Sequence, residues 1–548
     1  MTITTSPGHA VREPAPRLRL PLLDDYLREQ QELTAVERFA RRHDAPGAHG
    51  RYRDLLPARP PGPGQQYAFE VDLDACTSCK ACVTACHNLN GLDDGETWRS
   101  VGLLHGGSAA APVLQGVTTA CHHCLDPACM TGCPVGAYVK HPVTGIVEHL
   151  DDQCIGCQYC TFTCPYEVPQ YNARRGIVRK CDMCSGRLAG GEAPACVQAC
   201  PNEAIAITVI ETRQAVEDAQ GDAFLPGAPS PGITIPTTVY KTERALPRNL
   251  LPADFYRVAP SHHHAPLVVM LVLTQLSVGA FVIDAIASRA LPEHALATQQ
   301  PVHSIVALAV GLAALAASVF HLGRPRYAFR AVLGLRTSWM SREIAAFGLF
   351  AAAAVAYAAA SFSAPGANAG LGPGLHEALR WTVATLGVVG IACSVAIYHA
   401  TRRAWWTASI TGFKFFLTAA VLGLATTIVT SSAHRDRSGV PATLSYAVAL
   451  VSVLKAAGEA TLFLHLGDKR HTALKRSALL AANDLRGWSV ARFVTLALGG
   501  IALPLANASR GSLGLAIASL VVLALGELAE RTLFFAASSS PGMPGAVR

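Results

Sequence analysis

The sequence predicts a two-part fold, in which a soluble cysteine-rich domain is followed by an all-α bundle of eight transmembrane helices. Three observations predict it. Between residues 76 and 200 lie 16 of the 17 cysteines. From Ala265 onward, long apolar runs follow one another, whereas residues 1 to 255 have the composition of a soluble protein. The whole chain is 51% hydrophobic and only 15% charged, which is apolar for a soluble protein of 548 residues.

The cysteines of the first part form four groups with short, regular spacing. The groups are Cys76, Cys79, Cys82, Cys86; Cys121, Cys124, Cys129, Cys133; Cys154, Cys157, Cys160, Cys164; and Cys181, Cys184, Cys196, Cys200. The N-terminus shows no apolar stretch of signal-peptide length, so we expect metal binding here and no disulfide framework. The remaining cysteine, Cys393, lies inside an apolar run and is expected to be a small core residue.

The spacing favours iron–sulfur clusters over zinc. Three cysteines at steps of three, on a tight loop, can reach three corners of one 4Fe–4S cube, and the fourth, near a proline, can reach a second cube. Zinc sites usually show two CxxC pairs separated by a longer loop. The fourth group alone has that pattern, whereas a third cysteine at the same step in the first and third groups is surplus for zinc. The 16 ligands predict four 4Fe–4S clusters, and no 3Fe–4S centre is expected.

Three stretches of this block resemble a known family. They are "CTSCKACVTACHNLNGLDDGETWR", "CIGCQYCTFTCPYEVPQYNARRGIVRKCDMC" and "PACVQACP", and they are similar to the four-cluster electron-transfer subunit of the dimethyl sulfoxide reductase family of molybdenum enzymes. The resemblance implies an α+β fold of two ferredoxin-like modules, one inserted in the other. It also implies that each cube takes three cysteines from one group and one from another. The implied sets are Cys76, Cys79, Cys82 with Cys200; Cys181, Cys184, Cys196 with Cys86; Cys121, Cys124, Cys129 with Cys164; and Cys154, Cys157, Cys160 with Cys133.

Other polar residues of the block have two interpretations each. His122 and His123 could be alternative ligands, but four cysteines already fill the group, so we expect surface or supporting roles. A basic run consists of Arg174, Arg175, Arg179 and Lys180. It could be a solvated face, or it could dock an acidic partner or support the charge of a cluster.

The ends of the soluble half are less informative. Residues 22–43 show apolar positions at helical spacing, and Thr34 and Glu37 form a possible capping box. This helical segment could lie on a partner subunit or pack on the cluster domain. The expected division is an N-terminal helical segment and linker (1–66), a four-cluster domain (67–212), a connector (213–260), a membrane anchor (261–536) and a tail (537–548).

Eight apolar runs are long enough to span a bilayer, which takes about 20 residues. They fall at 265–288, 301–322, 343–363, 381–400, 415–431, 442–466, 493–509 and 511–530. With eight spans, the loops on the side of the cluster domain hold 20 Lys and Arg residues, against 5 on the other side. The positive-inside rule therefore predicts a multi-pass protein of the inner (cytoplasmic) membrane, with the iron–sulfur domain in the cytoplasm.

This half also resembles a family. The stretches "HHAPLVVMLVLTQLSVGAF", "HLGRPRYAFRAVLGLRTSWMSREI", "AWWTASITGFKFFLTAAVLG" and "GELAERTLFFAA" are similar to the eight-helix membrane anchor of dimethyl sulfoxide reductase. The resemblance implies a quinol site and no haem. It maps the quinone-binding residues onto His321, with Arg324 beside it, and onto Glu343. Because ionisable groups in a bilayer are costly, His321 and Glu343 are functional candidates by default. The alternative is a loop anchored by arginines and snorkelling side chains.

Other charged residues of the anchor are expected to be structural. Lys455 and Glu459 are four residues apart on one helix face, which permits a neutralising pair. Glu527, Glu530 and Arg531 are interpreted in the same way. Asp284 and His399 lie near predicted helix ends, where interfacial roles are expected. His262, His263 and His264 precede the first span, and a partial overlap with the quinol pocket stays open.

The predicted function is that of a fused electron-transfer and membrane-anchor subunit of a molybdopterin oxidoreductase complex. It would move electrons between menaquinone or ubiquinone and a separate catalytic subunit through four 4Fe–4S clusters, as in anaerobic electron transport of the dimethyl sulfoxide reductase type. We expect no nucleic-acid partner, because the excess of basic residues follows membrane topology. One alternative runs the same electron path oxidatively, from a sulfite dehydrogenase to quinone. Another is a ferredoxin–quinone redox hub without a molybdenum partner, and a third is a zinc-stabilised membrane scaffold.

Overall fold

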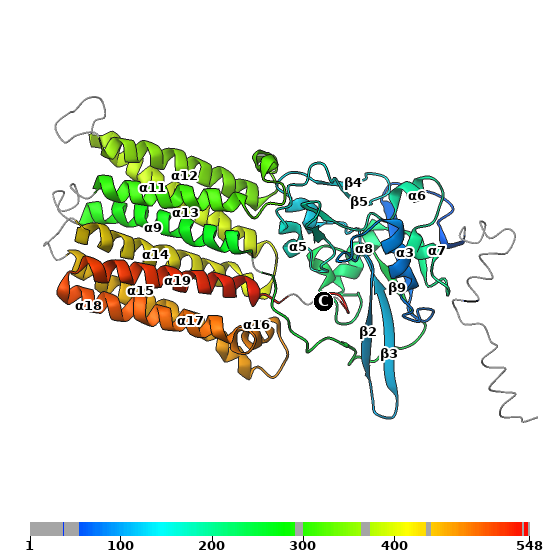
Figure 1. Ribbon diagram of the computed structural model, residues 1–548. Helices are drawn as coiled ribbons and strands as arrows, with labels where there is room; N and C mark the ends of the chain where they lie inside the picture. Colours follow the sequence, from blue (N-terminus) through cyan, green and yellow to red (C-terminus); the bar gives the residue numbers. More distant parts are fainter. Residues whose placement is uncertain are drawn as a thin grey trace, which may run out of the picture.

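The chain folds into a mixed α/β part and a long helical bundle that lie end to end (Figure 1). This computed structural model describes residues 37, 54–262, 264–290, 300–362, 373–433, 440–539 and 542–545. The predicted α+β and all-α classes are both confirmed. The helical segment expected at residues 22–43, with Thr34, lies outside the described residues apart from Glu37, and so does His263.

Two three-stranded sheets form the frame of the α/β part. Central strand β1 (Gln65–Asp72) pairs antiparallel with β8 (Ile205–Glu211) and parallel with β9 (Val239–Lys241). The hairpin of β2 (Ser100–Gly107) and β3 (Pro112–Thr119) is extended by β10 (Leu251–Pro252). Buried and half-buried residues alternate along the start of β1, as expected for a strand with one face on a core.

Short helices and hairpins hold the cysteine loops on this frame. The hairpins are β4 (Tyr138–Lys140) with β5 (Val147–His149) and β6 (Gln170–Asn172) with β7 (Ile177–Arg179). The helices are α3 (Ala81–Leu89), α4 (Ala128–Thr131), α5 (Tyr159–Thr163), α6 (Ser185–Ala189) and α7 (Ala195–Gln198). Each of these helices contains a cysteine of a group or begins directly after one. The short helices therefore hold the cysteine loops in place.

The residues expected as a connector are part of the α/β part instead. They include α8 (Thr212–Gln220) and the short η2 (Pro231–Ile233). They also include β9, which is the edge strand of the first sheet, and β10, which is the edge strand of the second. The Pro-rich composition of residues 213–260 hid this because short edge strands tolerate proline. The chain then enters the bundle directly after Ser261 and His262.

The predicted number of eight spans is confirmed among the described residues, where eight helices are long and apolar enough to cross a membrane. They are α9 (Ala265–Ala290), α11 (Gln300–Val319), α12 (Trp339–Ser361), α13 (Pro373–His399), α14 (Ala408–Ala433), α15 (Val440–Ala460) with η5 (Thr461–Gly467), α17 (Arg486–Ala497) with η6 (Leu498–Ala502) and α18 (Leu503–Arg510), and α19 (Leu513–Ala536). Helix α16 (Ala473–Ala482) lies outside the spans.

Several spans begin before the expected residue. The fourth was expected at 381–400 and the fifth at 415–431, but they cover Gly374–His399 and Ala408–Ala433. The missed turns carry charged residues such as Arg380 and Lys414, which the fold pairs with carboxylates. An apolar run alone therefore underestimates a span whose charges are neutralised by other helices.

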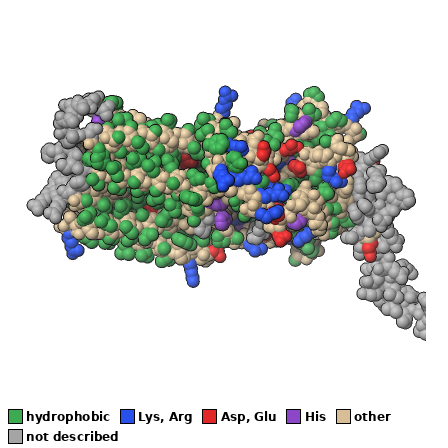
Figure 2. Space-filling model, turned by 45° about the horizontal axis from the view of Figure 1, so that its top comes forward, with side chains coloured by type: hydrophobic (Ala, Val, Ile, Leu, Met, Phe, Trp, Pro, Cys, Tyr) green, Lys and Arg blue, Asp and Glu red, His purple; other side chains and the backbone are tan. Residues whose placement is uncertain are grey.

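Small residues let the spans approach closely. A Cβ atom at Gly279 of α9 would lie 1.9 Å from the Ala419 carbonyl oxygen of α14, and one at Gly423 would lie 2.3 Å from the Gly279 carbonyl carbon. Such backbone contact drives helix association where lipid removes the hydrophobic force. On the outside, large apolar side chains such as Leu349, Leu450 and Val521 are exposed. Hydrophobic side chains cover the bundle, while charged ones gather over the α/β part and the junction (Figure 2).

The loop between α11 and α12 joins the two parts. It contains η3 (Pro325–Val332), whose Ala331 packs in a core with cysteines of the α/β part. Backbone hydrogen bonds cross the junction from Arg324 N to Ile155 O at 3.0 Å and from Gly334 N to Pro134 O at 2.8 Å. The short η4 (Ala404–Trp406), between α13 and α14, also lies at the junction. The cysteine-rich part is thus held against one end of the bundle.

Candidate functional site

The cysteine loops are tight turns that need left-handed backbone. Positive φ angles occur at Ser78 (59°), Lys80 (64°), Gly156 (69°), Gln158 (60°) and Cys184 (50°). Such turns direct consecutive backbone N–H groups inward, toward one anionic group. Backbone N–H groups donate to sulfur from Ala137 to Cys133 (3.3 Å), Gly156 to Cys154 (3.4 Å), Met183 to Cys181 (3.4 Å) and Ala204 to Cys200 (3.2 Å). These donors suit thiolate sulfur, the form that binds metal.

The fold brings the sixteen cysteines together in four sets of four. After burial, which is the largest cause, the pKa of most of these thiols is raised by the charges of neighbouring cysteines, and most of those neighbours belong to the same set. The Cys76 set is Cys76, Cys79, Cys82, Cys200, and the Cys181 set is Cys86, Cys181, Cys184, Cys196. The Cys121 set is Cys121, Cys124, Cys129, Cys164, and the Cys154 set is Cys133, Cys154, Cys157, Cys160. This grouping agrees with the pairing that the resemblance implies.

The four sets follow one another toward the bundle. The Cys76 and Cys181 sets adjoin each other, because the charge of Cys82 raises the pKa of Cys196. The Cys181 and Cys121 sets also adjoin, because the charge of Cys121 raises the pKa of Cys181. Tyr138 connects the last two, because after burial the charges of Cys160 and Cys129 raise its pKa. The Cys154 set is the one at the junction, since its Cys157 packs against the apolar core of the bundle.

The donor set fits iron–sulfur clusters. All 17 cysteines are free of disulfide bonds. Burial raises the pKa of the Cys86 thiol to about 12, so a metal charge is needed to remove the proton at neutral pH. Across the described ranges, no three or more His, Cys, Asp or Glu side chains converge closely enough to hold one metal ion. Four cysteines that bind four separate irons of a cube need not converge on one point, whereas the ligands of a single zinc ion must.

Two buried bases lie among the sulfurs. Arg99, which sequence reasoning missed, is 2% exposed and donates from Nη1 to Thr118 Oγ1 at 3.2 Å. Lys180 is 3% exposed and donates to the carbonyl oxygens of Cys181 (2.9 Å) and Val147. Such cations offset the negative charge of thiolate-bound clusters.

The basic run from Arg174 to Lys180 therefore divides in two. Arg179 and Lys180 are both buried, Lys180 beside the sulfurs and Arg179 in an ion pair with Glu96 at 2.8 Å. Arg174 and Arg175 are exposed, and Arg174 pairs with Asp93 at 2.6 Å. The expected solvated face is thus limited to the first two arginines of the run.

His122 and His123 are buried, not at the surface. His122 Nδ1 lies 2.8 Å from Thr238 Oγ1, and His123 Nδ1 accepts from the backbone N–H of Val147 at 3.0 Å. Burial lowers the pKa of His122 to about 3, so the ring is neutral. Both rings line the cavity beside Cys121 and Cys124 without joining the cysteine set, which is the supporting role expected for them.

The loop of the Cys154 set reaches into the bundle with two aromatic side chains. Tyr159 donates from its hydroxyl to the Ile397 carbonyl oxygen at 2.6 Å, and the ring of Phe162 lies 5.4 Å from that of Trp406. Burial, and then the charges of Cys157 and Glu343, raise the pKa of Tyr159. Tyr159 therefore contacts α13, the helix whose Ser394 donates to the predicted quinone residue Glu343, from the loop of a predicted cluster ligand.

His321 follows the second span at the junction. Its Nδ1 contacts the Ser318 carbonyl oxygen, which can only accept, so Nδ1 carries the proton and Nε2 has a free lone pair in the neutral ring. Burial lowers the pKa of His321, which keeps the ring neutral near pH 7. A neutral imidazole of this kind can accept a proton from a hydroxyl group.

Glu343 and Arg324 have different surroundings. Glu343 is buried one turn inside α12, where it accepts a hydrogen bond from Ser394 Oγ of α13. Arg324 donates from Nη1 to the Asp151 carbonyl oxygen at 2.7 Å and from Nε to that of Arg175 at 3.4 Å. The guanidinium of Arg324 thus ties the loop of His321 to the cysteine-rich part.

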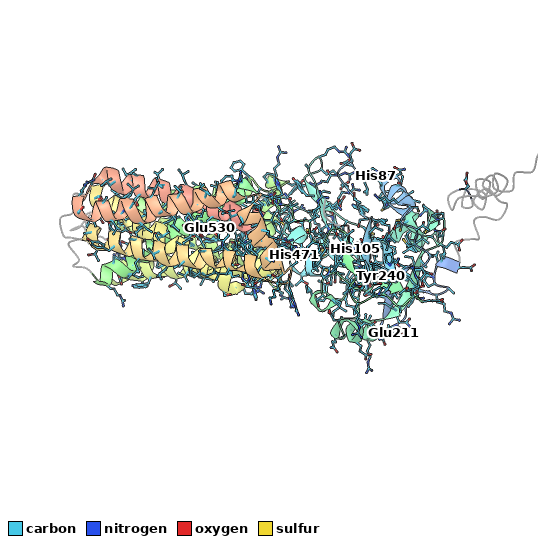
Figure 3. All side chains as sticks on the ribbon, turned by 90° about the horizontal axis from the view of Figure 1, so that it is seen from below. His87, His105, Glu211, Tyr240, His471 and Glu530 are labelled. Atoms are coloured by element: carbon cyan, nitrogen blue, oxygen red, sulfur yellow. The ribbon has the colours of Figure 1, made fainter. Side chains whose placement is uncertain are left out.

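A buried network of charges fills the second half of the bundle. Its members are Lys414, Lys455, Glu459, Arg492, Glu527, Glu530 and Arg531, and each is at most 8% exposed. The closest ion pairs are Lys414–Glu530 (2.7 Å), Arg492–Glu459 (2.8 Å), Lys455–Glu527 (2.9 Å) and Arg492–Glu527 (3.0 Å). Glu530 lies inside the bundle and His471 at the junction (Figure 3).

This network extends the expected Lys455–Glu459 pair, which is 3.7 Å apart. Sequence reasoning missed Lys414 and Arg492, because their partners lie on other helices and no spacing within one helix reveals them. Asp284, expected at an interface, also has partners: Tyr357 donates to it at 2.6 Å and Arg380 lies 3.5 Å away. His399, at the end of α13, is exposed.

Comparison with known proteins covers both parts of the polypeptide. Residues 259–537 match the family described as the DMSO reductase anchor subunit, and residues 114–210 match the 4Fe-4S dicluster domain. The B subunit of anaerobic dimethyl sulfoxide reductase from Haemophilus influenzae is 35% identical over 189 residues, which are 33% of this chain and 91% of that protein. The corresponding B subunit of Escherichia coli K12 is 38% identical over 172 residues, 30% of this chain and 83% of that protein. The thiosulfate reductase electron transfer subunit PhsB of Salmonella typhi is 37% identical over 143 residues, 26% of this chain and 74% of that protein.

Proposed function

Because this protein belongs to the DMSO reductase anchor subunit family and carries an iron–sulfur electron-transfer domain on the same polypeptide, we propose that it oxidises a membrane quinol. The electrons then pass to a separate molybdopterin catalytic subunit. The observation that carries the proposal is that Tyr159, from the loop of the cysteine set at the junction, donates to Ile397 of α13, the helix whose Ser394 donates to Glu343. This contact supports a quinone site close to the cysteine set at the junction.

The quinone residues of the proposal are His321 and Glu343, and Arg324 positions their loop. Oxidation of a quinol releases two electrons and two protons. His321 Nε2 is the acceptor for the first hydroxyl proton, because Nδ1–H is already bound to the Ser318 carbonyl oxygen. Glu343, whose carboxylate is held by Ser394, is the acceptor for the second. Menaquinone and ubiquinone both offer the required pair of ring oxygens.

The sixteen group cysteines are the proposed ligands, four to each cluster. When bound, the four 4Fe–4S clusters supply one-electron carriers whose potentials depend on nearby charge and hydrogen bonds. Arg99 and Lys180 contribute positive charge beside the sulfurs, and backbone N–H groups donate to Cys133, Cys154, Cys181 and Cys200. The order of the sets runs from the junction to the far side of the α/β part, where a catalytic partner would dock. No haem is part of the proposal.

The chain is a multi-pass membrane protein, and we assign it to the inner membrane with the iron–sulfur domain in the cytoplasm. The Lys- and Arg-rich loops all lie on the side of that domain. Lys414, Arg492 and Arg531 are buried in the bundle and therefore give no information on which side a loop lies. The excess of Lys and Arg on the side of the iron–sulfur domain persists when these three are left out of the count. The loops with Arg324 and Arg403 touch the α/β part directly, which agrees with one common side.

Direction of electron flow separates the main proposal from its alternative. The names of the relatives, two dimethyl sulfoxide reductase subunits and a thiosulfate reductase subunit, favour a reductase. The second candidate is an oxidative complex that passes electrons from sulfite to quinone.

Membranes that contain this chain with its natural partners test the proposal. Quinol-dependent reduction of dimethyl sulfoxide or thiosulfate, lost in a His321→Ala variant, is the expected result. Sulfite-dependent quinone reduction alone would establish the oxidative candidate. If neither occurs while reduced ferredoxin still reduces the quinone pool, the chain is a redox hub without a molybdenum partner and the main proposal is wrong.

A further inference from the structure

A polar cleft opens where the α/β part meets the end of the bundle. It has a volume of about 410 Å³. One wall belongs to the α/β part and includes the loop of Phe162 and the segment that leads into α9. The other wall belongs to the bundle, where Arg403 follows α13, Arg476 lies in α16 and Ser538 follows α19. The cleft is thus lined by residues that lie just outside the membrane spans.

The cleft lies at the level where the apolar surface of the bundle ends. Leu464 of η5 is 75% exposed, whereas Lys469 and Arg470, which follow it before α16 begins, are exposed basic residues. His471 lies at the junction (Figure 3). Such a change from exposed apolar to exposed basic side chains is typical of the boundary between hydrocarbon and lipid headgroups. The basic loop therefore leads to Arg476 at the depth of the headgroups.

Arg476 is a half-buried cation without a close anion. No carboxylate lies within ion-pair distance of it among the described residues, and its side chain donates no hydrogen bond there. The guanidinium lies over the Phe255 ring, 4.8 Å from its centroid. Its Nε is fully enclosed without a partner, but its two terminal nitrogens are accessible. Burial lowers the pKa of Arg476, and the charge of Asp254 offsets this only in part.

Arg403 is held in a fixed orientation beside the same cleft. Its Nε donates to the Phe162 carbonyl oxygen at 3.3 Å, and its Nη1 donates to Ser538 Oγ at 3.4 Å. Its Nη2 is accessible and has no partner in the part of the chain that the structure describes. Burial lowers the pKa of Arg403, which the charges of Glu167 and Cys164 offset only in part. A guanidinium fixed in this way offers its free N–H groups to an oxygen of a carboxylate or phosphate.

The charges of the cleft favour an anion. Three arginines line it, Arg257, Arg403 and Arg476, against the two carboxylates of Glu167 and Asp254. None of these arginines forms an ion pair within 4.0 Å among the described residues. One positive charge is therefore in excess, even with the histidines of the cleft neutral. A phosphodiester carries one negative charge and accepts hydrogen bonds from guanidinium groups.

We propose that this cleft binds the headgroup of an anionic phospholipid, whose phosphodiester oxygens accept hydrogen bonds from Arg403 and Arg476. A lipid is favoured over other anions because the cleft lies at headgroup depth, where basic pockets beside membrane spans meet anionic lipids. Free phosphate presents the same oxygens, and an acidic segment of a partner subunit presents similar ones. The site requires only that the chain spans a membrane, and it is independent of the proposed quinol chemistry.

Binding is measured on the full chain with its clusters, in phosphatidylcholine nanodiscs that contain a little phosphatidylglycerol with a photoreactive headgroup. Mapping of the labelled peptides should place the label in residues 252–264, 403–407 or 470–476. Arg476→Gln should weaken this labelling about fivefold, the effect of about one basic residue near an anionic surface. Arg403→Lys keeps the charge but removes the planar fork, so labelling should fall as well. Arg486→Gln, at an exposed position of α17 outside the cleft, is the matched control and should change nothing.

Four results would overturn the proposal. Equal labelling by a phosphatidylcholine that carries the same photoreactive group would show that the charge of the headgroup is not recognised. Loss of the label in excess inorganic phosphate would make free phosphate the occupant. Loss of the label when the catalytic subunit is bound would assign the cleft to that partner. An equal decrease in Arg486→Gln and Arg476→Gln would show a diffuse attraction to basic surface. Cluster absorbance of each variant shows that the fold is retained.

Discussion

The hydroxyl group of Tyr159 donates a hydrogen bond to the carbonyl oxygen of Ile397 at 2.6 Å, across the junction between the cysteine-rich part and the bundle. Tyr159 comes from the loop of Cys157 and Cys160, and Ile397 lies in the last turn of α13. The bond therefore fixes the cysteine set at the junction relative to the helix that also carries Ser394, the partner of Glu343.

Replacing Tyr159 by Phe should loosen this junction. The Ile397 carbonyl loses a buried donor, which costs about 1–3 kcal/mol. We expect the temperature at which cluster absorbance is lost to fall, with the iron content of the purified chain unchanged. Tyr67→Phe, on β1 and away from the junction, is the control. Equal thermal midpoints for the two variants would contradict this account.

Gly323→Ala should separate the two parts sterically. A Cβ atom there would lie 2.2 Å from the Gly176 carbonyl oxygen, so backbone on one side must move. Overpacking of this kind costs about 1–3 kcal/mol. We expect slower reduction of the clusters by quinol, but normal reduction by dithionite, which needs no junction. Gly348→Ala, where nothing lies within 4 Å of the added carbon, should behave like the wild type.

The quinol reaction should have an acid limb that belongs to His321. Burial lowers the pKa of this ring below its ordinary value of 6.5, so Nε2 is free at neutral pH and is lost as an acceptor only when the pH falls through the lowered pKa. The rate of cluster reduction by quinol should therefore stay constant near pH 7 and decline at pH values below 6.5. His321→Gln should be slow at every pH and lack that limb. An unchanged acid limb in the variant would assign it to another group.

Arg492→Leu should be strongly destabilising. Arg492 faces Glu459 and Glu527, so its loss leaves buried carboxylates without their cation. Breaking a buried pair in this way costs about 3–5 kcal/mol. We expect little folded protein in membranes, and partial recovery when Glu459→Gln is combined with it, because one buried charge is then removed. Arg510→Leu, at the far end of α18, is the control, and a normal yield of Arg492→Leu would show that the network contributes little to stability.

The sequence was most informative where the chemistry is local. Cysteine spacing and apolar runs depend on neighbours in the chain, and they predicted the cysteine loops and the number of spans. It was least informative where partners come from distant segments. Arg99 among the sulfurs, Lys414 and Arg492 in the bundle, and the strands β9 and β10 in the expected connector all depend on contacts across long stretches of chain.

The residues proposed to bind quinone lie between these cases. The sequence identified His321 and Glu343 as costly polar groups near a span end, but Tyr159 carries no such signal, because a tyrosine within a cysteine loop looks like any other spacer. Only the folded chain brings Tyr159 to Ile397 and toward Glu343. Arg324, expected at the quinone, holds the carbonyl groups of Asp151 and Arg175.

The most direct test mixes the purified chain, with oxidised clusters and without any catalytic subunit, with a reduced quinol in the absence of oxygen. Cluster absorbance is followed in the wild type, in His321→Ala and in Glu343→Gln, with dithionite as the reference reductant. We predict that quinol bleaches the clusters of the wild type, that both variants lose this reaction, and that dithionite reduces all three. Clusters that dithionite reduces but quinol does not, in the wild type, would contradict the claim that this chain joins quinone chemistry to its own iron–sulfur clusters.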